Sequence, residues 1–218
     1  MRLSANLRVL YLHGFASSPA SRKAQFFSAQ LERLGFQVEI PDLAEADFEH
    51  LAISKQLAVV ARVARSEPVI LIGSSMGGYL AALYAARHPE VERVILMAPA
   101  FDFYQLWSRE LGEEKLHVWK EQGTLPVFHH GEGRTMPLAF EMFEDARQFP
   151  AYPDFSQPGL IFHGTADSVV PLQKSIEFAA THANVRLIKF PTGHELTDVL
   201  DDMWNASNDF LLSGRHPL

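Results

Sequence analysis

The chain has 218 residues, of which 47% are apolar and 21% charged, and this excludes a disordered or collagen-like chain. A net charge of −7 argues against a nucleic-acid-binding protein, because such proteins carry a basic surface. The absence of cysteine excludes disulfides, Cys-ligated metals and a cysteine nucleophile. No apolar run is long enough to span a membrane or to form a signal peptide. We therefore expect a cytoplasmic protein with a single domain over residues 1–218.

Short apolar runs alternate along the chain with longer segments whose apolar residues recur three and four positions apart. The short runs are typical of strands buried on both faces of a parallel sheet, and the longer segments of amphipathic helices. This alternation predicts an α/β fold with a doubly wound, mostly parallel sheet of six strands and helices on both faces. In chain order the predicted elements are strand 7–12, helix 22–34, strand 36–40, helix 48–65, strand 68–72, helix 76–87, strand 93–97, strand 159–162, helix 172–182, strand 185–190 and a last helix from 195 to about 212.

One connection is much longer than the others. Residues 98–158 separate the fourth and fifth predicted strands, whereas a crossover with its helix needs only about 12 residues. We expect a cap insertion of short helices at about 101–150, with a turn or hairpin at residues 130–133. The aromatic residues of this segment either pack against the sheet or line a substrate pocket, for which Trp107 and Phe140 are the candidate wall residues.

The sequence GSSMGG at residues 73–78 lies where a predicted strand ends and a predicted helix begins. This is the setting of a nucleophile elbow, a sharp strained turn that requires small residues two positions before and after the nucleophile. Ser75 has Gly73 and Gly77 at these positions, whereas Ser74 has no glycine at either. The pattern therefore predicts Ser75 as a nucleophile. The structural alternative is a glycine-rich turn that packs a helix onto the sheet.

A serine hydroxyl needs a base, and the base needs an orienting carboxylate. His194 follows the last predicted strand and so lies at the carboxyl edge of the sheet, where active sites of open α/β sheets form. Asp167, after the fifth strand, is the preferred carboxylate, and Asp102, after the fourth, is the alternative. We interpret Asp198 as a solvated charge one turn into the last helix. The candidate catalytic residues are therefore Ser75, Asp167 and His194.

Other histidines are assigned structural roles. His13 and His163 each end a predicted strand and precede a glycine, which indicates turn-forming roles. His129 and His130 are adjacent and would face opposite sides of a strand, which argues against a shared metal ion. We predict no metal ligand among these residues.

Four segments in this order resemble the α/β-hydrolase superfamily, namely residues 12–15, the elbow around Ser75, the acid loop 163–171 and the pair 193–194. The resemblance spans nearly the whole chain and is greatest to small bacterial carboxylesterases and acyl-protein thioesterases. It implies an oxyanion hole formed by the backbone N–H groups of Phe15 and Met76. The Met76 N–H would lie at a helix N-terminus, which favours negative charge.

The resemblance also implies a function. A serine hydrolase of the carboxylesterase or thioesterase type would cleave an ester or thioester of a small or medium hydrophobic acyl group through an acyl-serine intermediate. The expected partner is such a small molecule and not a nucleic acid, no segment is expected to span a membrane, and the reaction needs no metal or organic cofactor. Amide, peptide or C–C bond hydrolysis on the same triad is the alternative, followed by a non-catalytic binding module. Homo-oligomerisation stays open.

Overall fold

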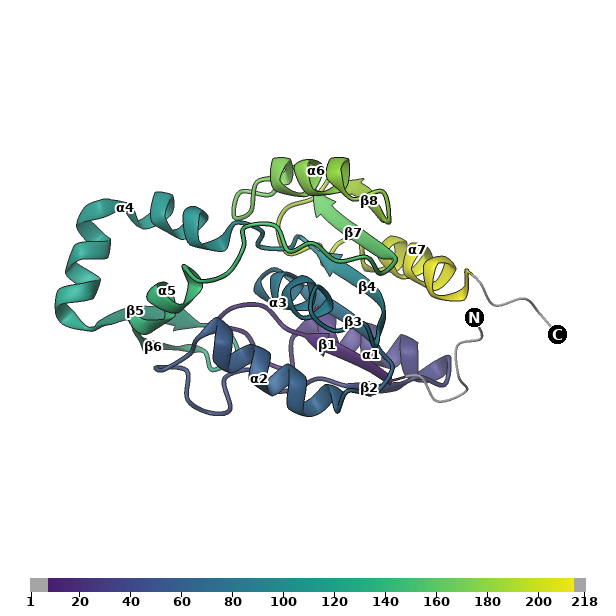
Figure 1. The fold of residues 1–218 in the computed structure, drawn as a ribbon, viewed down its shortest axis with the longest axis horizontal. Coiled ribbons are helices and arrows are strands. Elements are labelled where there is room, and N and C mark those ends of the chain that lie inside the picture. Colours follow the sequence, from purple (N-terminus) through teal and green to yellow (C-terminus); the bar gives the residue numbers. More distant parts are fainter. Residues whose placement is uncertain (1–7, 214–218) are drawn as a thin grey trace.

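The computed structural model describes residues 8–213, and Figure 1 shows a central twisted sheet between helices. The sheet is parallel, as the sequence predicts, and Leu7 of the first predicted strand lies outside the described residues. Its strands are β1 (Arg8–Leu12), β2 (Gln37–Glu39), β3 (Val69–Ser74), β4 (Val91–Met97), β7 (Gly159–Gly164) and β8 (Val185–Phe190). They are ordered β2-β1-β3-β4-β7-β8 across the sheet.

Helices cover both faces of this sheet, because successive side chains of each strand point to opposite sides. Leu10 and Leu12 of β1 join the core on one face, whereas Val9 and Tyr11 join the core on the other. The first core is covered by α2 (Ile53–Ala64), α3 (Met76–Ala85) and α6 (Leu172–Thr181). The second is covered by α1 (Arg22–Arg33) and α7 (Leu200–Leu212). The predicted doubly wound α/β architecture is thus confirmed.

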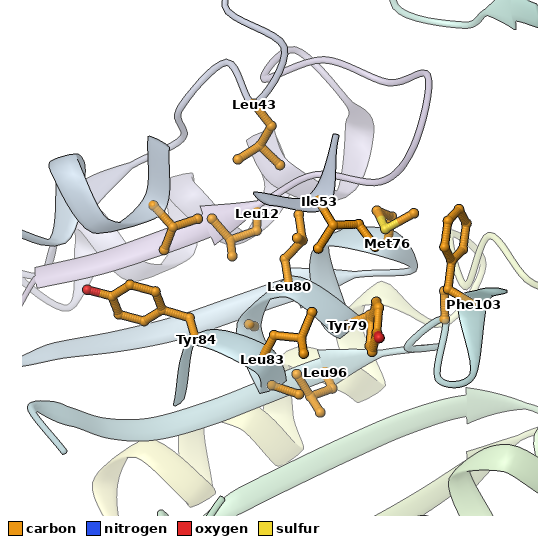
Figure 2. Packing of buried hydrophobic residues seen from close by; sticks show 14 of the residues in the cluster. Leu12, Leu43, Ile53, Met76, Tyr79, Leu80, Leu83, Tyr84, Leu96 and Phe103 are labelled. Atoms are coloured by element: carbon orange, nitrogen blue, oxygen red, sulfur yellow. The ribbon is translucent and has the colours of Figure 1, made fainter. Parts of the chain in front are cut away.

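Helix α3 is the most deeply buried helix of the described chain, with every one of its residues buried. A helix that is apolar all round belongs inside a core, and α3 lies between the sheet and α2. Figure 2 shows Leu80 and Leu83 of α3 among the side chains of the sheet, with Leu12 and Leu96 beside them. This packing fixes the N-terminus of α3, which immediately follows Ser75.

Most predicted boundaries lie within two residues of the observed ones, but two helices begin later than predicted. Helix α2 begins at Ile53 instead of residue 48, because Phe48 and Leu51 are buried in the preceding loop and continue its apolar pattern. Helix α7 begins at Leu200 instead of residue 195. Asp198 therefore lies before that helix, not one turn into it, and accepts a hydrogen bond from the Thr192 hydroxyl.

The segment predicted as a cap contains short helices, as the sequence predicts. The backbone at Gly112 is not helical, so α4 consists of two helices joined at a kink, and a third, shorter helix follows in α5. The predicted hairpin at residues 130–133 is confirmed, since antiparallel strands flank this turn. The elements are α4 (Phe103–Gln122), β5 (Thr124–His129), β6 (Arg134–Ala139) and α5 (Glu141–Ala146). In Figure 1 they extend to the left of the six-stranded sheet.

Candidate active site

Ser75 occupies the sharp turn between β3 and α3. Its backbone has φ 53° and ψ −116°, a strained conformation for a residue with a side chain. Three hydrogen bonds hold this turn: the Ser75 N–H donates to the Met97 carbonyl at 2.8 Å, and the Ser75 carbonyl accepts from the N–H groups of Tyr79 at 3.1 Å and Ala100 at 3.0 Å. The surrounding structure thus determines the strained backbone, as at a nucleophile elbow.

The glycines that flank Ser75 are required by close backbone approach. A Cβ atom at Gly77 would lie 2.0 Å from the Leu12 carbonyl oxygen, and one at Gly73 would lie 2.2 Å from the Gly77 carbonyl oxygen. Both neighbours are backbone atoms of the core, which cannot rotate away. Strand β1, strand β3 and helix α3 can therefore meet at this turn only with glycine at both positions.

We expect Gly77→Ala to lower the free energy of unfolding by about 3 kcal/mol or more, because the added methyl overlaps fixed backbone. Urea unfolding followed by circular dichroism measures this. Gly14→Ala is the matched control, since a Cβ atom there would contact its nearest neighbour at an ordinary 3.5 Å. In Gly14→Ala the free energy of unfolding should fall by less than about 1 kcal/mol. Equal losses in the two variants would contradict the close-approach argument.

Three side chains predicted from the sequence form one hydrogen-bonded chain. His194, in the loop after β8, has its Nε2 atom 3.1 Å from the Ser75 Oγ atom. Its Nδ1 atom lies 2.8 Å from Oδ2 of Asp167, in the loop after β7. Because a carboxylate oxygen only accepts, Nδ1 carries the proton and Nε2 is free to accept the Ser75 hydroxyl proton. This arrangement can raise the nucleophilicity of a serine.

Asp167 is held as a charged group inside the protein. Its side chain is fully buried, which alone would raise its pKa, but the hydrogen bonds from His163, His194 and the Val170 N–H outweigh burial and lower the pKa of Asp167 well below its usual range. Its Oδ1 atom accepts from the N–H groups of Val169 and Val170, both at 2.8 Å. The carboxylate is therefore ionised at neutral pH and cannot rotate freely.

The alternative carboxylate, Asp102, lies in a different interaction. Its Oδ2 atom is 2.7 Å from Nζ of Lys174, and both side chains are about 15% exposed. Asp102 precedes α4 with a left-handed backbone. It has no contact with His194 among the interactions of residues 8–213. The geometry therefore favours Asp167 over Asp102 as the partner of His194.

Two backbone N–H groups near Ser75 are available to a ligand. Phe15, in the loop after β1, lines the same cavity as Ser75, and Met76 is the first residue of α3. Within the described part of the chain, neither of these N–H groups donates a hydrogen bond to a protein acceptor. A helix N-terminus carries a partial positive charge, which adds to the Met76 donor. Their use as an oxyanion hole stays a prediction.

His13 shapes the loop that carries Phe15, in line with its predicted turn-forming role. Its Nδ1 atom lies 3.0 Å from the Gly14 carbonyl, and its Nε2 atom lies 3.4 Å from the Leu43 nitrogen. A carbonyl only accepts and an N–H only donates, so Nδ1 carries the proton and Nε2 does not. Burial lowers the pKa of His13, although the Gly14 hydrogen bond and Asp42 oppose this effect. His13 is thus stable as the neutral form.

We expect His13 to make the free energy of unfolding fall as the pH decreases from 7 to 5. The pKa of His13 in the folded protein lies below the unfolded value of about 6.5, so the unfolded chain binds the proton first. The contribution of neutral His13 to the free energy of unfolding is therefore fully present above about pH 6.5 and is lost as the pH falls below it. Urea unfolding at several pH values should give a flatter dependence for His13→Asn, which keeps a neutral donor. Identical slopes for both proteins would contradict this role.

A cavity of about 730 Å³ opens beside Ser75 and His194. Its walls come from the loop after β1, the first turn of α1, the turn of the β5–β6 hairpin and the His194 loop. Most of the lining residues have polar side chains, including several serines, Arg22 and Lys23, but the larger share of the cavity surface is apolar. Burial lowers the pKa of Lys23, and Glu195, whose carboxylate lies 3.8 Å from Nζ, partly offsets this. The cavity thus combines an apolar surface with charged and hydroxyl groups near α1.

Neither predicted pocket residue lines this cavity. The Trp107 ring packs edge-on against Phe15, with 5.1 Å between ring centroids. Phe140 packs against Trp119 and Phe143, at 5.3 and 5.7 Å. The aromatic residues of the insertion thus mostly contact one another, and Trp107 and Phe128 reach the cavity wall only indirectly, through Phe15 and His130. The assignment of Trp107 and Phe140 to a substrate pocket stays a prediction that this cavity does not support.

Sequence reasoning missed three residues near the site. His163 contacts Asp167 instead of only ending a strand, and Lys23 and His130 line the cavity. The His130 N–H donates to the Ala16 carbonyl at 2.8 Å, which joins the hairpin turn to the loop after β1. For His163 the i, i+4 spacing to Asp167 is a usable signal. Nothing local in the sequence indicates that Lys23 or His130 reaches the cavity.

Residues 8–213 contain no group of three or more His, Asp or Glu side chains arranged to hold a metal ion. None of the helices in this range has the length and apolar character needed to cross a membrane.

This sheet, with its elbow and its loops at the carboxyl edge, defines an α/β-hydrolase fold, and solved structures agree. Mouse alpha/beta hydrolase domain-containing protein 10 is 20% identical and has a TM-score of 0.79, covering 95% of this chain and 90% of that chain. Est1E from Butyrivibrio proteoclasticus is 20% identical with a TM-score of 0.78, covering 95% and 87%. Monoacylglycerol lipase from Paleococcus ferrophilus is 16% identical with a TM-score of 0.76, covering 95% of each chain. These similarities show the fold.

Residues 8–211 match the uncharacterised protein family UPF0227, and the chain belongs to this family. Among curated proteins, the monoacylglycerol lipase abhd6-B of Xenopus laevis is 30% identical over 110 residues. This match covers 48% of the present chain and 29% of that protein, so it spans less than a third of the relative.

Proposed function

We propose that this protein is a serine hydrolase that cleaves a carboxylic ester or thioester through an acyl-Ser75 intermediate. The observation that carries the proposal is the hydrogen-bonded chain from Asp167 through His194 to Ser75, which ends on a strained turn beside a cavity. The fold shared with Est1E and with a monoacylglycerol lipase of known structure supports an ester substrate, as does the partial sequence similarity to the monoacylglycerol lipase abhd6-B.

In the first half of the reaction, His194 Nε2 accepts the hydroxyl proton of Ser75 while Oγ attacks the substrate carbonyl carbon. The carbonyl oxygen becomes an oxyanion, and the N–H groups of Phe15 and Met76 donate to it. Loss of one such donor typically raises the barrier by about 3 kcal/mol. His194 then gives its proton to the departing alcohol or thiol, which leaves Ser75 acylated.

In the second half, His194 accepts a proton from a water molecule as the water oxygen attacks the acyl carbon. The acid product leaves when the proton returns from His194 to the Ser75 oxygen. Asp167 stays ionised throughout and stabilises the protonated His194, which is consistent with its lowered pKa.

We further propose that the acyl group is small or medium in size and hydrophobic. The cavity volume of about 730 Å³ lies within the usual range of small-molecule sites, roughly 300–1,000 Å³. Its apolar surface comes from Phe15, Ala20 and Val169, and the Val169 side chain is largely exposed. These residues can cover a short acyl chain, whereas the polar wall near α1 remains for the rest of the substrate.

Labelling with a fluorophosphonate tests the nucleophile, because this probe modifies only an activated serine. We expect one label, located on Ser75 by peptide mass spectrometry, and its absence would overturn the proposal. The substrate class is tested with p-nitrophenyl esters of increasing acyl length beside matched thioesters and amides. We expect esters or thioesters to be cleaved fastest. Faster amide cleavage would replace esterase activity by amidase activity on the same residues.

A further inference from the structure

A second histidine contacts the carboxylate of Asp167. His163 lies in β7 and is fully buried, as is the Asp167 side chain. Its Nδ1 atom is 2.8 Å from the Ser175 Oγ atom of α6. Its Nε2 atom is 2.9 Å from the Val170 carbonyl and 3.2 Å from Oδ2 of Asp167. The imidazole of His163 therefore fills the space between α6 and the loop that carries Asp167.

The position of one proton on His163 follows from these partners. The Val170 carbonyl and the ionised Asp167 both only accept, so Nε2 must carry a proton that faces both oxygens. The Ser175 hydroxyl can donate to Nδ1, which stabilises the tautomer protonated at Nε2. Ser175 is itself fully buried, so no water competes for this hydrogen bond.

We propose that His163 is a positioning residue for the catalytic reaction. Its Nε2–H donates a hydrogen bond to Oδ2 of Asp167, the same oxygen that accepts a hydrogen bond from His194. The inference rests on the proposed function, because it assigns His163 a role that acts through Asp167 and His194. His163 does not touch the substrate. It fixes the direction of the Asp167 carboxylate, and through it the orientation of the His194 ring relative to Ser75.

Two physical effects follow because Oδ2 of Asp167 accepts hydrogen bonds from both His163 and His194. The Asp167 carboxylate is held at Oδ2 by both histidines and at Oδ1 by two backbone N–H groups, so its plane is fixed. The His163 N–H also withdraws charge from Oδ2, which moderates how strongly Asp167 stabilises protonated His194. Lys23 of α1 also interacts electrostatically with Asp167.

The test compares His163→Gln, which keeps a hydrogen-bond donor in the side chain, with His163→Leu, which has none. Gln can place its amide nitrogen near the position of Nε2, whereas Leu fills similar space without a donor. With p-nitrophenyl acetate, we expect His163→Leu to reduce kcat about 10- to 100-fold with KM nearly unchanged, a loss of the size found when a hydrogen bond that orients a functional side chain is removed. His163→Gln should recover most of this loss. Equal kcat values in Leu, Gln and wild type would overturn the proposal.

The pH dependence separates positioning from general damage. Without the His163 donor, Oδ2 carries more negative charge and stabilises protonated His194 more strongly. The acidic limb of the kcat/KM profile should therefore move to higher pH in His163→Leu and stay in place in His163→Gln. A smaller fraction of folded enzyme would lower kcat/KM at every pH without moving the acidic limb. If folded His163→Leu has its acidic limb at the wild-type pH, the proposal is contradicted.

Two further measurements keep the inference testable if His163→Leu does not fold. Ser175→Ala removes only the hydroxyl at Nδ1 and should reduce kcat by a smaller factor, about 2- to 10-fold. The proton between His194 Nδ1 and Asp167 should give a far-downfield NMR resonance that shifts in Ser175→Ala and stays near its wild-type position in His163→Gln. This readout needs no activity, so a resonance that is unshifted in Ser175→Ala refutes the role of His163, whereas an unlabelled Ser75 refutes the proposed function itself.

Discussion

Ser75→Ala should reduce ester hydrolysis to near the uncatalysed rate, by about 10⁶-fold in kcat if the loss equals that of a serine protease nucleophile. The methyl group cannot attack the carbonyl carbon, and no other hydroxyl group is within hydrogen-bond distance of His194 Nε2 among the described residues. Fold and stability should be unchanged, because the strained turn is held by backbone hydrogen bonds. Initial rates with a chromogenic ester measure the loss, and circular dichroism verifies the fold.

Ser74→Ala is the matched control for this substitution. Ser74 is the adjacent serine, but it is the last residue of β3 and is buried, and its hydroxyl interacts with Tyr11 on the face covered by α1. We expect this variant to keep more than about a tenth of the activity, since it loses only a neutral hydrogen bond. The opposite pattern, in which Ser74→Ala is inactive and Ser75→Ala active, would overturn the assignment.

Asp167→Asn should lower kcat by about 10⁴-fold, as the equivalent change does in a serine protease. The amide removes the negative charge that stabilises protonated His194. It also places a donor where Oδ2 now accepts from His194 Nδ1 and His163 Nε2, so the His194 proton would move to Nε2. In that tautomer His194 cannot accept the Ser75 proton.

Asp102→Asn is the matched control for the acid, because Asp102 was the alternative from sequence. It should lose the ion pair with Lys174 and change kcat by less than about 10-fold. Thermal unfolding of both variants separates misfolding from lost catalysis. A severe loss only in Asp102→Asn would transfer the orienting role to that residue.

The sequence was sufficient for the sheet because its information is local. Buried parallel strands are unbroken apolar runs, so β1, β3 and β7 are recognisable without any knowledge of their neighbours. The elbow is equally local, since a backbone approach of 2.0 Å at Gly77 leaves a fixed glycine spacing. Ser75, Asp167 and His194 each follow a strand, which places them at one edge of a parallel sheet.

Contacts between distant segments could not be predicted. The start of α7 was placed five residues early because the turn 195–199 has no glycine or proline and reads as a continuation of the helix. His163 was assigned only a turn, since its contact with Ser175 depends on how α6 packs on β7. The pocket wall at Lys23 and His130 depends on where α1 and the β5–β6 hairpin meet, which no pattern within either segment encodes.

The position of β7 in the sheet has a consequence during protein synthesis. Strands β1 to β4 are complete once residue 97 has left the ribosome. On one edge β4 pairs with β3, but its partner on the other edge is β7, which begins only at Gly159. Until then Val94–Met97 exposes an apolar, unpaired edge, the kind of surface that recruits other chains. At 5–20 residues per second, translation of residues 98–158 lasts on the order of 3–12 s. The nascent chain thus contains Ser75 and an unpaired strand edge before Asp167 and His194 have been synthesised, and we expect this edge to be a site of aggregation until β7 pairs with it.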